Sequence, residues 1–148
     1  MKSINIVVGT DHRGYHQKEM LREAVMIGDY FITWHDVGCY SLERTDYPIF
    51  AHKAVHALTQ GECQLGVLLC GTGIGMSIAA NRFKGVRAGL AWSSGVAQKA
   101  REEDNCNVLV IPVDYVEPEQ IVNVVQAWLM AEFKGGRYAE RLEMIDKK

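Results

Sequence analysis

The chain has 148 residues, of which 48% are hydrophobic and 23% charged, and its formal net charge at pH 7 is −2. This length is typical of one domain with a single compact core, so residues 1–148 are interpreted as one domain. The charge is nearly balanced and forms no basic block, which argues against nucleic acid or a membrane surface as the partner. No apolar run approaches the roughly 20 residues that span a bilayer.

The N-terminal stretch MKSINIVVGTDH lacks the long apolar region and the small-residue cleavage site of a signal peptide. The cysteines are scattered and form no C-x-x-C pair. We therefore expect free thiols and a cytoplasmic location. The four cysteines are Cys39, Cys63, Cys70 and Cys106.

In the N-terminal half, strand-like and helix-like segments alternate. The β-branched run INIVVGT predicts a first strand, and the helical spacing of apolar residues after it predicts a helix. A second strand leads into a loop punctuated by Gly38 and Pro48, and Gly61 ends the helix that follows. In chain order the segments are strand 4–10, helix 14–27, strand 30–37, loop 38–48 and helix 49–60.

The C-terminal half continues this alternation. The wholly apolar run LGVLLC is typical of a strand that is covered on both faces. Pro112 marks the end of the last strand, and Pro118 fits the first turn of the next helix. In chain order the segments are strand 65–70, helix 75–82, strand 86–92, helix 94–104, strand 107–112, helix 118–133 and a short helix 137–145.

Five strands alternating with helices predict a three-layer α/β domain with a parallel sheet. Right-handed crossovers favour a doubly wound sheet, for which we predict the flavodoxin-like order 2-1-3-4-5 and a C-terminal helix that projects outward. Such sheets bind ligands at the carboxyl ends of the strands, beside the point where the strand order reverses. Asp11 and His12 follow strand one, and Cys70 ends strand three, so we expect these residues to share one crevice.

Three alternating glycines, Gly71, Gly73 and Gly75, connect strand three to the next helix. Their spacing matches neither the dinucleotide fingerprint G-x-G-x-x-G nor a phosphate loop with Gly-Lys-Ser/Thr. Backbone N–H groups at such a helix start face inward and form a cradle for an oxyanion. On this segment alone, a tight connection that binds nothing remains the alternative.

Cys70 lies just before this turn, where the helix dipole is expected to lower the pKa of its thiol. A thiolate at this point acts as a base or nucleophile, with Thr72 as a hydrogen-bonding partner; the alternative is a buried, inert cysteine. Arg137 and Arg141 share a face of the last helix and form either a phosphate clamp or a solvated pair. We expect no metal site, because no set of ligands has a convincing spacing.

Four blocks of the sequence, TDHRGY, ERTDYP, CGTGIGMSIAANRFKGVRA and GGRYAER, resemble the type B ribose-5-phosphate isomerases. The related galactose-6-phosphate isomerase subunits share part of this pattern, and the similarity runs from about residue 4 to residue 145. The resemblance implies a metal-free aldose–ketose isomerase without a cofactor, which moves a proton between C1 and C2 of a phosphorylated sugar through an enediolate. It also implies a homodimer, or a tetramer of two such dimers, with the site between two subunits.

The resemblance implies a role for each matched residue. Cys70 takes the proton, Thr72 assists it, and backbone N–H groups of the turn hold the developing oxyanion. Some members of the family lack the cysteine and carry a glutamate where Met76 stands here, so this chain has the cysteine version. The implied substrate contacts are the backbone of Gly71, Gly73, Ile74 and Gly75, the side chains of Asp11 and Tyr47 at sugar hydroxyls, and those of His12, Arg137 and Arg141 at the phosphate.

Two positions depart from the family pattern. Glu103 and Asp104 stand where the family usually has a His-Asn pair before the fifth strand. The resemblance implies that the first of these positions serves in ring opening and the second in substrate contact. Glu103 can open a furanose ring if burial raises its pKa. Alternatively, it is a solvated helix residue and the substrate is a four-carbon sugar that forms no ring. Asp114 stands where the family often has an arginine.

Ribose 5-phosphate and ribulose 5-phosphate are therefore the expected substrates, and two alternatives stay open. One is an isomerase of another phosphosugar, such as a tetrose 4-phosphate or the 6-phosphate of allose or galactose. The other is a sugar-phosphate binding protein without catalytic activity. The presence of Cys70 and Thr72 beside the glycines argues against the second, because binding alone needs no thiol.

Overall fold

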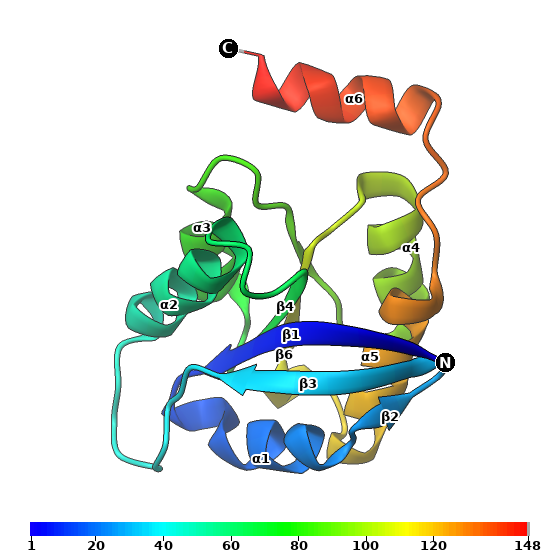
Figure 1. The fold of residues 1–148 in the computed structure, drawn as a ribbon. Helices are drawn as coiled ribbons and strands as arrows, with labels where there is room; N and C mark the ends of the chain where they lie inside the picture. The colour runs from blue at the N-terminus through cyan, green and yellow to red at the C-terminus, as the bar shows by residue number, and fades with distance from the viewer. Residues whose placement is uncertain (148) are drawn as a thin grey trace.

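The computed structural model describes residues 1–147 and contains a six-stranded sheet with helices on both faces (Figure 1). Five strands are parallel, and a two-residue sixth, β2, pairs antiparallel with β3 at the edge. The α/β class and the three-layer doubly wound sheet are confirmed. The strands are β1 (Lys2–Thr10), β2 (Met26–Ile27), β3 (Tyr30–Asp36), β4 (Leu65–Cys70), β5 (Ala88–Leu90) and β6 (Val108–Pro112).

The order of the last two strands differs from the prediction. The sheet runs β2-β3-β1-β4-β6-β5, so the five parallel strands, numbered along the chain, lie in the order 2-1-3-5-4 and not 2-1-3-4-5. Burial explains the exchange: every residue of β6 is buried, whereas the three residues of β5 are only partly buried. The apolar strand thus takes the interior position, and the short, glycine-containing strand takes the edge.

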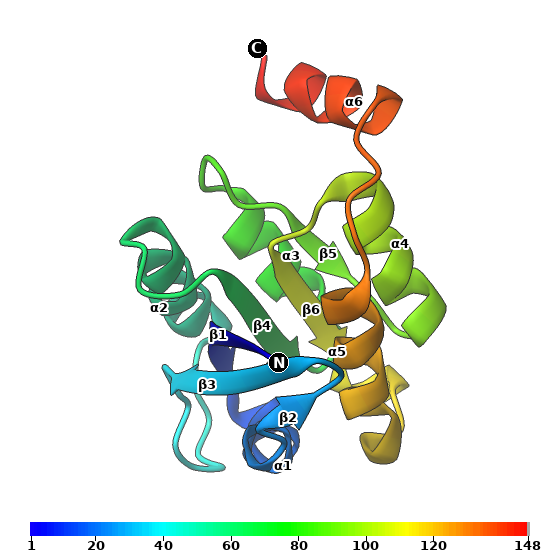
Figure 2. The same ribbon diagram turned by 45° about the vertical axis from the view of Figure 1, so that its right-hand side comes forward.

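Right-handed crossovers then decide which helix covers which face. The chain moves in one direction across the sheet through α2 and α3, which pack on one face, and in the other direction through α1 and α4, which lie with α5 on the opposite face (Figure 2). The α-helices are α1 (Tyr15–Glu23), α2 (Tyr47–Thr59), α3 (Ile74–Asn81), α4 (Ser94–Asp104), α5 (Ile121–Met130) and α6 (Arg137–Asp146). Short 3-10 helices are η1 (His12–Gly14), η2 (Val113–Tyr115) and η3 (Pro118–Gln120).

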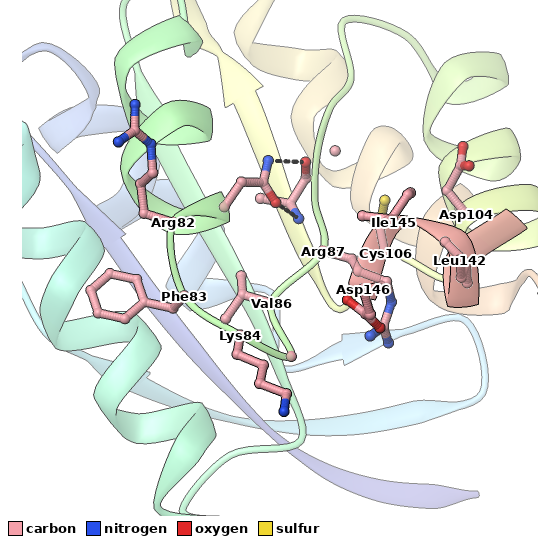
Figure 3. A pocket seen from close by; sticks show the side chains of 14 residues that line it. Arg82, Phe83, Lys84, Val86, Arg87, Asp104, Cys106, Leu142, Ile145 and Asp146 are labelled. Atoms are coloured by element: carbon pink, nitrogen blue, oxygen red, sulfur yellow. Dashed lines mark hydrogen bonds between the residues drawn. The ribbon is translucent and has the colours of Figure 1, made fainter. Parts of the chain in front are cut away.

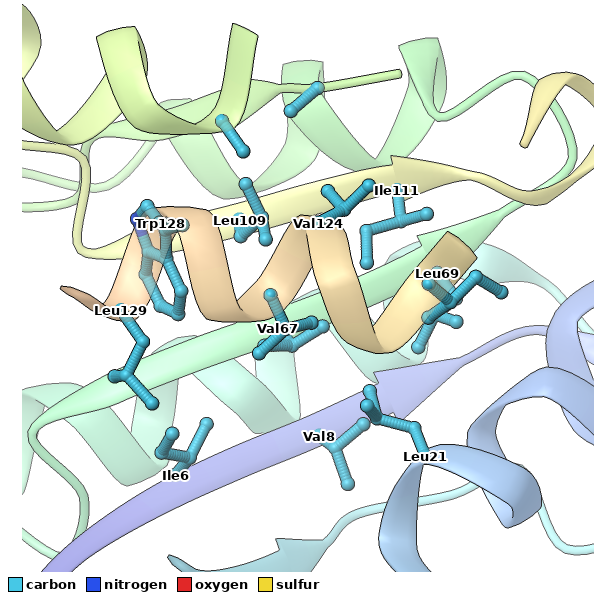
Figure 4. Packing of buried hydrophobic residues seen from close by; sticks show 14 of the residues in the cluster. Ile6, Val8, Leu21, Val67, Leu69, Leu109, Ile111, Val124, Trp128 and Leu129 are labelled. Atoms are coloured by element: carbon cyan, nitrogen blue, oxygen red, sulfur yellow. The ribbon is translucent and has the colours of Figure 1, made fainter. Parts of the chain in front are cut away.

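Two hydrophobic cores sandwich the sheet. Figure 4 shows one of them, in which α5 lies across β1, β4 and β6 with Trp128 fully buried and its Nε1 donating to Cys106 O at 3.0 Å. Along β4, Val67 and Leu69 face this core, while Leu68 and Cys70 face the second core beneath α2 and α3. The alternation of strand side chains therefore points the Cys70 thiol toward the face that carries the glycine turn.

Several predicted boundaries shift for identifiable reasons. The helix predicted over 14–27 ends at Glu23, because Met26 and Ile27 pair with β3 as the edge strand that the prediction missed. The helix predicted over 118–133 begins as the 3-10 turn η3 and ends at Met130. Within residues 1–147, the structure offers no helix with the length and apolar character needed to cross a membrane.

A buried ion pair ties α1 to the end of β3. Lys18 is fully buried and its Nζ lies 2.6 Å from Asp36 Oδ2, which also lies 3.2 Å from Nη1 of the partly exposed Arg22. Asp36 Oδ1 accepts a hydrogen bond from Gly38 N at 2.9 Å. Because Asp36 leads directly into the loop over 38–46, this pair holds the base of that loop.

Asp36→Asn is expected to lower the free energy of unfolding by about 3–5 kcal/mol, because it leaves the buried Lys18 ammonium without its main counter-charge. Glu19→Gln is the matched control: Glu19 also approaches Lys18, at 3.6 Å, but is about a third exposed, so a loss of about 0–1 kcal/mol is expected. Urea unfolding followed by circular dichroism measures both. Equal losses would show that burial of the pair is not what stabilises this junction.

Candidate active site

The strand order reverses between β1 and β4, and this junction brings two predicted site residues into contact. Thr10 pairs with Leu69 in the β1–β4 register, so the next residue on each strand, Asp11 and Cys70, emerges at the same edge. Cys70 Sγ lies 3.5 Å from Asp11 Oδ2, and the two residues are 7% and 5% exposed. The result is a buried thiol that donates a hydrogen bond to a buried carboxylate.

The pKa of the Cys70 thiol is raised above its ordinary value, contrary to the lowering expected from the helix dipole. Burial is the main cause, and the negative charge of Asp11 and the hydrogen bond to it add to the rise. The backbone N–H groups of Gly73 and Gly71 act on the thiol in the opposite direction, but they do not outweigh burial. Cys70 is therefore protonated at neutral pH in the free protein.

The glycine turn wraps around this sulfur. Gly73 has a left-handed φ of 75°, and a Cβ at this position would lie 2.5 Å from Leu90 Cδ1, so only glycine fits. Thr72 Oγ1 accepts a hydrogen bond from the backbone N of Ile74, the first residue of α3, at 3.3 Å. The amides of Gly71 and Gly73 thus lie close to Cys70, where the sequence predicted an oxyanion cradle.

The loop between β3 and α2 packs against the same strand ends. His12 N donates to Thr45 Oγ1 at 3.1 Å, and Thr45 N donates to His12 Nδ1 at 3.2 Å. Because Nδ1 accepts, the neutral His12 ring carries its proton on Nε2. The ring of Tyr47 lies against Gly75, where a Cβ would be 2.7 Å from Tyr47 Cε1. Tyr47 is therefore brought to the glycine turn, and His12 is held against the loop that precedes α2.

Arg13 is part of this site, although the sequence analysis did not select it. Its guanidinium lies on Gly71, where a Cβ would be 2.7 Å from Arg13 Nε, and it forms an ion pair with Asp114. Asp114 N also donates to Gly71 O at 3.1 Å. The position of Arg13 directly after His12 was the one available signal. Asp114, which stands where the family often has an arginine, thus has Arg13 as its cationic partner.

Four of the predicted site residues lie at the opposite end of the sheet, near the amino ends of its strands. Glu103 and Asp104 end α4, just before the chain enters the amino end of β6, whereas Cys70 pairs with Pro112 at its carboxyl end. From Val108 to Pro112, β6 advances about 13 Å. The structure therefore does not bring these residues, or Arg137 and Arg141 on α6, to the Cys70 crevice of the same chain (Figures 1 and 2).

The two arginines of α6 flank the Tyr138 ring, with their guanidinium carbons 5.2 Å and 5.7 Å from its centre. A hydrogen bond to Tyr138 raises the pKa of Arg137, and the charge of Glu103 contributes less. Arg137 and Glu103 are thus electrostatic neighbours. Lys99 Nζ lies 3.8 Å from Glu103 Oε1, and about a third of the Glu103 side chain is exposed.

A pocket of about 730 Å³ also lies at this far edge (Figure 3). Its walls come from the loop between α3 and β5, from the segment that leads into β6, and from the underside of α6. It is the space between α6 and the rest of the chain, and neither Cys70 nor Asp11 lines it. Among residues 1–147, no group of three or more His, Cys, Asp or Glu side chains is placed to hold a metal ion.

A doubly wound sheet with a thiol–carboxylate pair and helix-start amides at its switch point defines a small-molecule site suited to proton transfer. A family profile described as Ribose/Galactose Isomerase matches residues 6–145. The chain therefore belongs to this family of sugar phosphate isomerases.

Individual relatives agree with this assignment. Ribose-5-phosphate isomerase B of Escherichia coli strain K12 is 41% identical over 141 residues, covering 95% of this chain and 93% of the relative. D-erythrulose-4-phosphate isomerase of Pectobacterium atrosepticum is 34% identical over 147 residues, covering 96% and 93%. The crystal structure of a ribose 5-phosphate isomerase from Thermotoga maritima has a TM-score of 0.92 and 39% identity, covering 98% of this chain and 99% of that one.

Asp11→Asn is expected to lower the pKa of Cys70, because it removes the negative charge and the carboxylate acceptor that raise it. At pH 7.5 iodoacetamide should then alkylate Cys70 at least about threefold faster, the change that half a pKa unit makes. Peptide mass mapping across a pH series measures this rate. Burial raises the pKa of Cys106 to about 11, so its alkylation serves as an internal reference.

Asp29→Asn is the matched control, since Asp29 directly precedes β3 and so lies at the amino ends of the strands, away from Cys70. It should leave the Cys70 alkylation profile unchanged. If the pH midpoint of Cys70 alkylation in Asp11→Asn stayed the same or rose, it would contradict the electrostatic coupling of Cys70 with Asp11.

Proposed function

We propose that this protein interconverts ribose 5-phosphate and ribulose 5-phosphate, with Cys70 as the base. The observation that carries the proposal is the 3.5 Å contact between Cys70 Sγ and Asp11 Oδ2 beneath the amides of the glycine turn. In the aldose-to-ketose direction, the Cys70 thiolate removes the proton from C2, and the electron pair moves onto the carbonyl oxygen to form an enediolate. The Cys70 thiol then returns the proton to C1, the C2 hydroxyl passes its own proton to the C1 oxygen, and the C2 oxygen becomes the carbonyl.

The resting thiol must first lose its own proton. Asp11 Oδ2 already accepts a hydrogen bond from that thiol, so the proton passes to Asp11 as the thiolate forms. The amides of Gly71 and Gly73 favour the thiolate. Thr72, at the same turn, is the group that assists at a substrate oxygen. The amides that lead into α3 stabilise the negative charge on the enediolate.

A complete site requires two copies of the chain. His12 lies at the crevice, whereas Arg137 and Arg141 are at the far edge of the same chain, so all three meet one phosphate only if a second copy supplies the arginines. The shape of α6 supports this: its ten residues, all within the described part of the chain, include none that is buried, and Met144 and Ile145 are exposed. An isolated helix this short is marginal in water, so α6 needs a partner surface.

A suitable surface lies beside the crevice. Ile74 and Ile78 are one turn apart on α3 and both are exposed, as is Ile49 on the adjacent α2. Exposed apolar clusters of this kind mark interfaces between proteins, and a two-fold axis pairs each crevice with the α6 of the partner. The proposed functional unit is therefore a homodimer, from which a tetramer of two dimers can also form.

Glu103 and Asp104 enter the site through the same pairing. They lie at the edge that carries α6, and Glu103 is an electrostatic neighbour of Arg137. We assign ring opening to Glu103 as a general acid–base, and a substrate contact to Asp104.

A second candidate substrate is a four-carbon aldose 4-phosphate. Two observations favour it: the relative from Pectobacterium atrosepticum is a D-erythrulose-4-phosphate isomerase, and Glu103 is a partly solvated carboxylate rather than a histidine. A tetrose 4-phosphate forms no furanose ring and needs no ring opening. The chemistry at Cys70 is the same for both substrates.

Cys70→Ala is expected to lower kcat by about 10²–10⁴-fold, the usual contribution of a general base. Its Kd for ribose 5-phosphate should stay within a few-fold of wild type, because the phosphate contacts remain. Cys63→Ala is the matched control and should keep wild-type turnover, since Cys63 is a buried thiol of the second core.

The assay compares kcat/KM for four-, five- and six-carbon aldose phosphates, together with exchange of the C2 proton in D₂O. The largest value with ribose 5-phosphate supports the proposal, and a larger value with the tetrose selects the second candidate. Binding without any C2 exchange would identify a sugar-phosphate binding protein instead.

Mixing two inactive variants tests the shared site. In a mixed dimer of Cys70→Ala and Arg137→Ala chains, one crevice carries both changes and the other carries neither. Co-refolded mixtures are therefore expected to recover about a quarter of wild-type activity, since half of the dimers are mixed and each has one intact site. Mixtures that stay as inactive as the separate variants would show that Cys70 and Arg137 do not serve one site in this way.

A further inference from the structure

The ion pair between Arg13 and Asp114 crosses the carboxyl end of β4 at Gly71, the residue after Cys70. Arg13 follows β1, Gly71 follows β4 and Asp114 follows β6, and these three strands are neighbours in the sheet. The Arg13 guanidinium lies on Gly71, and its Nη2 contacts Asp114 Oδ2. The pair therefore spans the carboxyl end of the strand that carries Cys70.

Both backbones are anchored to the site. Arg13 N donates to Asp11 Oδ1 at 3.0 Å, which is the carboxylate that receives the Cys70 hydrogen bond through its other oxygen. Asp114 N donates to Gly71 O at 3.1 Å. The two side chains, in contrast, are 50% and 39% exposed, so the guanidinium is open to an incoming ligand.

Stability alone does not account for this arrangement. An ion pair exposed to this extent contributes little to folding, because water screens it and two long side chains lose freedom. A guanidinium has five N–H donors in a fixed fork, so one contact with Asp114 leaves donors for a second oxyanion. His12, which directly precedes Arg13, carries its proton on Nε2 and adds another donor at the same strand end.

We infer that Arg13 recognises the phosphate group of the substrate and that Asp114 holds its guanidinium in place until the phosphate competes for it. This inference rests on the proposed function, which supplies the phosphosugar. Asp114 then acts as a positioning residue that weakens phosphate binding through its own charge. Arg13 is a substrate-binding cation in addition to His12 and the arginines of α6.

Variants at the two positions separate this role from a structural one, since either change breaks the same ion pair. Arg13→Gln should weaken the affinity for inorganic phosphate and raise the KM for ribose 5-phosphate by about 10- to 100-fold, with a much smaller effect on kcat. Asp114→Asn should act in the opposite direction and tighten phosphate binding by up to about fivefold. Arg13→Lys should restore part of the affinity.

Isothermal titration with inorganic phosphate measures affinity without turnover, and steady-state kinetics provide KM and kcat. Lys2→Gln is the charge-matched control, because Lys2 begins β1 and so lies at the opposite end of that strand from Arg13. Thermal unfolding shows whether each variant folds. If Arg13→Gln does not fold, Asp114→Asn still tests the inference.

Weaker phosphate binding in both variants would overturn the inference, because it would mean that the intact pair is what matters. Unchanged phosphate binding in both, or a loss confined to kcat, would also overturn it. Absence of turnover on every phosphosugar would refute the proposed function, while the phosphate titration would still test Arg13.

Discussion

The site depends on one constraint, which is that the sheet is wound outward in both directions from the β1–β4 pair. The chain leaves β1 toward one edge of the sheet to form β3, and it then returns past β1 to place β4 on the other side of it. The carboxyl ends of β1 and β4 are then adjacent, and the first residue past β1 meets the last residue of β4. The Asp11–Cys70 contact is a direct result of this topology.

Burial sets the electrostatic character of this contact. A thiol beside a helix start in open water has a lowered pKa, but Cys70 is enclosed by the second core and faces a carboxylate. Its resting state is therefore a thiol with an acceptor in place, and the turn amides favour the charged form. This balance is compatible with the role proposed for Cys70, which is a thiol at rest and a thiolate when it reacts. The exposed Arg13–Asp114 pair stands outside this enclosure, where solvent and ligand reach it.

The chain distributes its polar groups between two ends. The crevice holds the thiol, the carboxylate and the amides, whereas α6 carries its arginines at the other edge and buries none of its own residues, all of which are described. In the proposed dimer, the surface that α6 lacks within its own chain is provided by the partner. Binding and proton transfer then depend on association, and the same apolar contacts that stabilise α6 also complete the phosphate site.

Local sequence patterns were sufficient to predict much of the fold. Alternating apolar runs and helical spacing identified all five parallel strands, and the C-G-T-G-I-G segment located the turn after β4. The position of the site at the carboxyl ends of strands one and three could also be predicted, because these two strands are adjacent in doubly wound sheets in general. The homology that marks the family is likewise contained in the sequence, since the profile match covers residues 6–145.

Other features were decided only in three dimensions. Neither the interior position of β6 nor the pairing of Met26 and Ile27 with β3 can be read from a single segment, because both depend on competition among strands for burial. The raised pKa of Cys70 depends on how completely the second core encloses it. The pairing of Arg13 with Asp114 joins residues 101 positions apart, which are brought together only because β1 and β6 both lie beside β4 in the sheet. The sequence by itself determined which groups the protein carries; the tertiary structure decided which of them meet, because contacts across a sheet follow strand order and burial rather than distance along the chain.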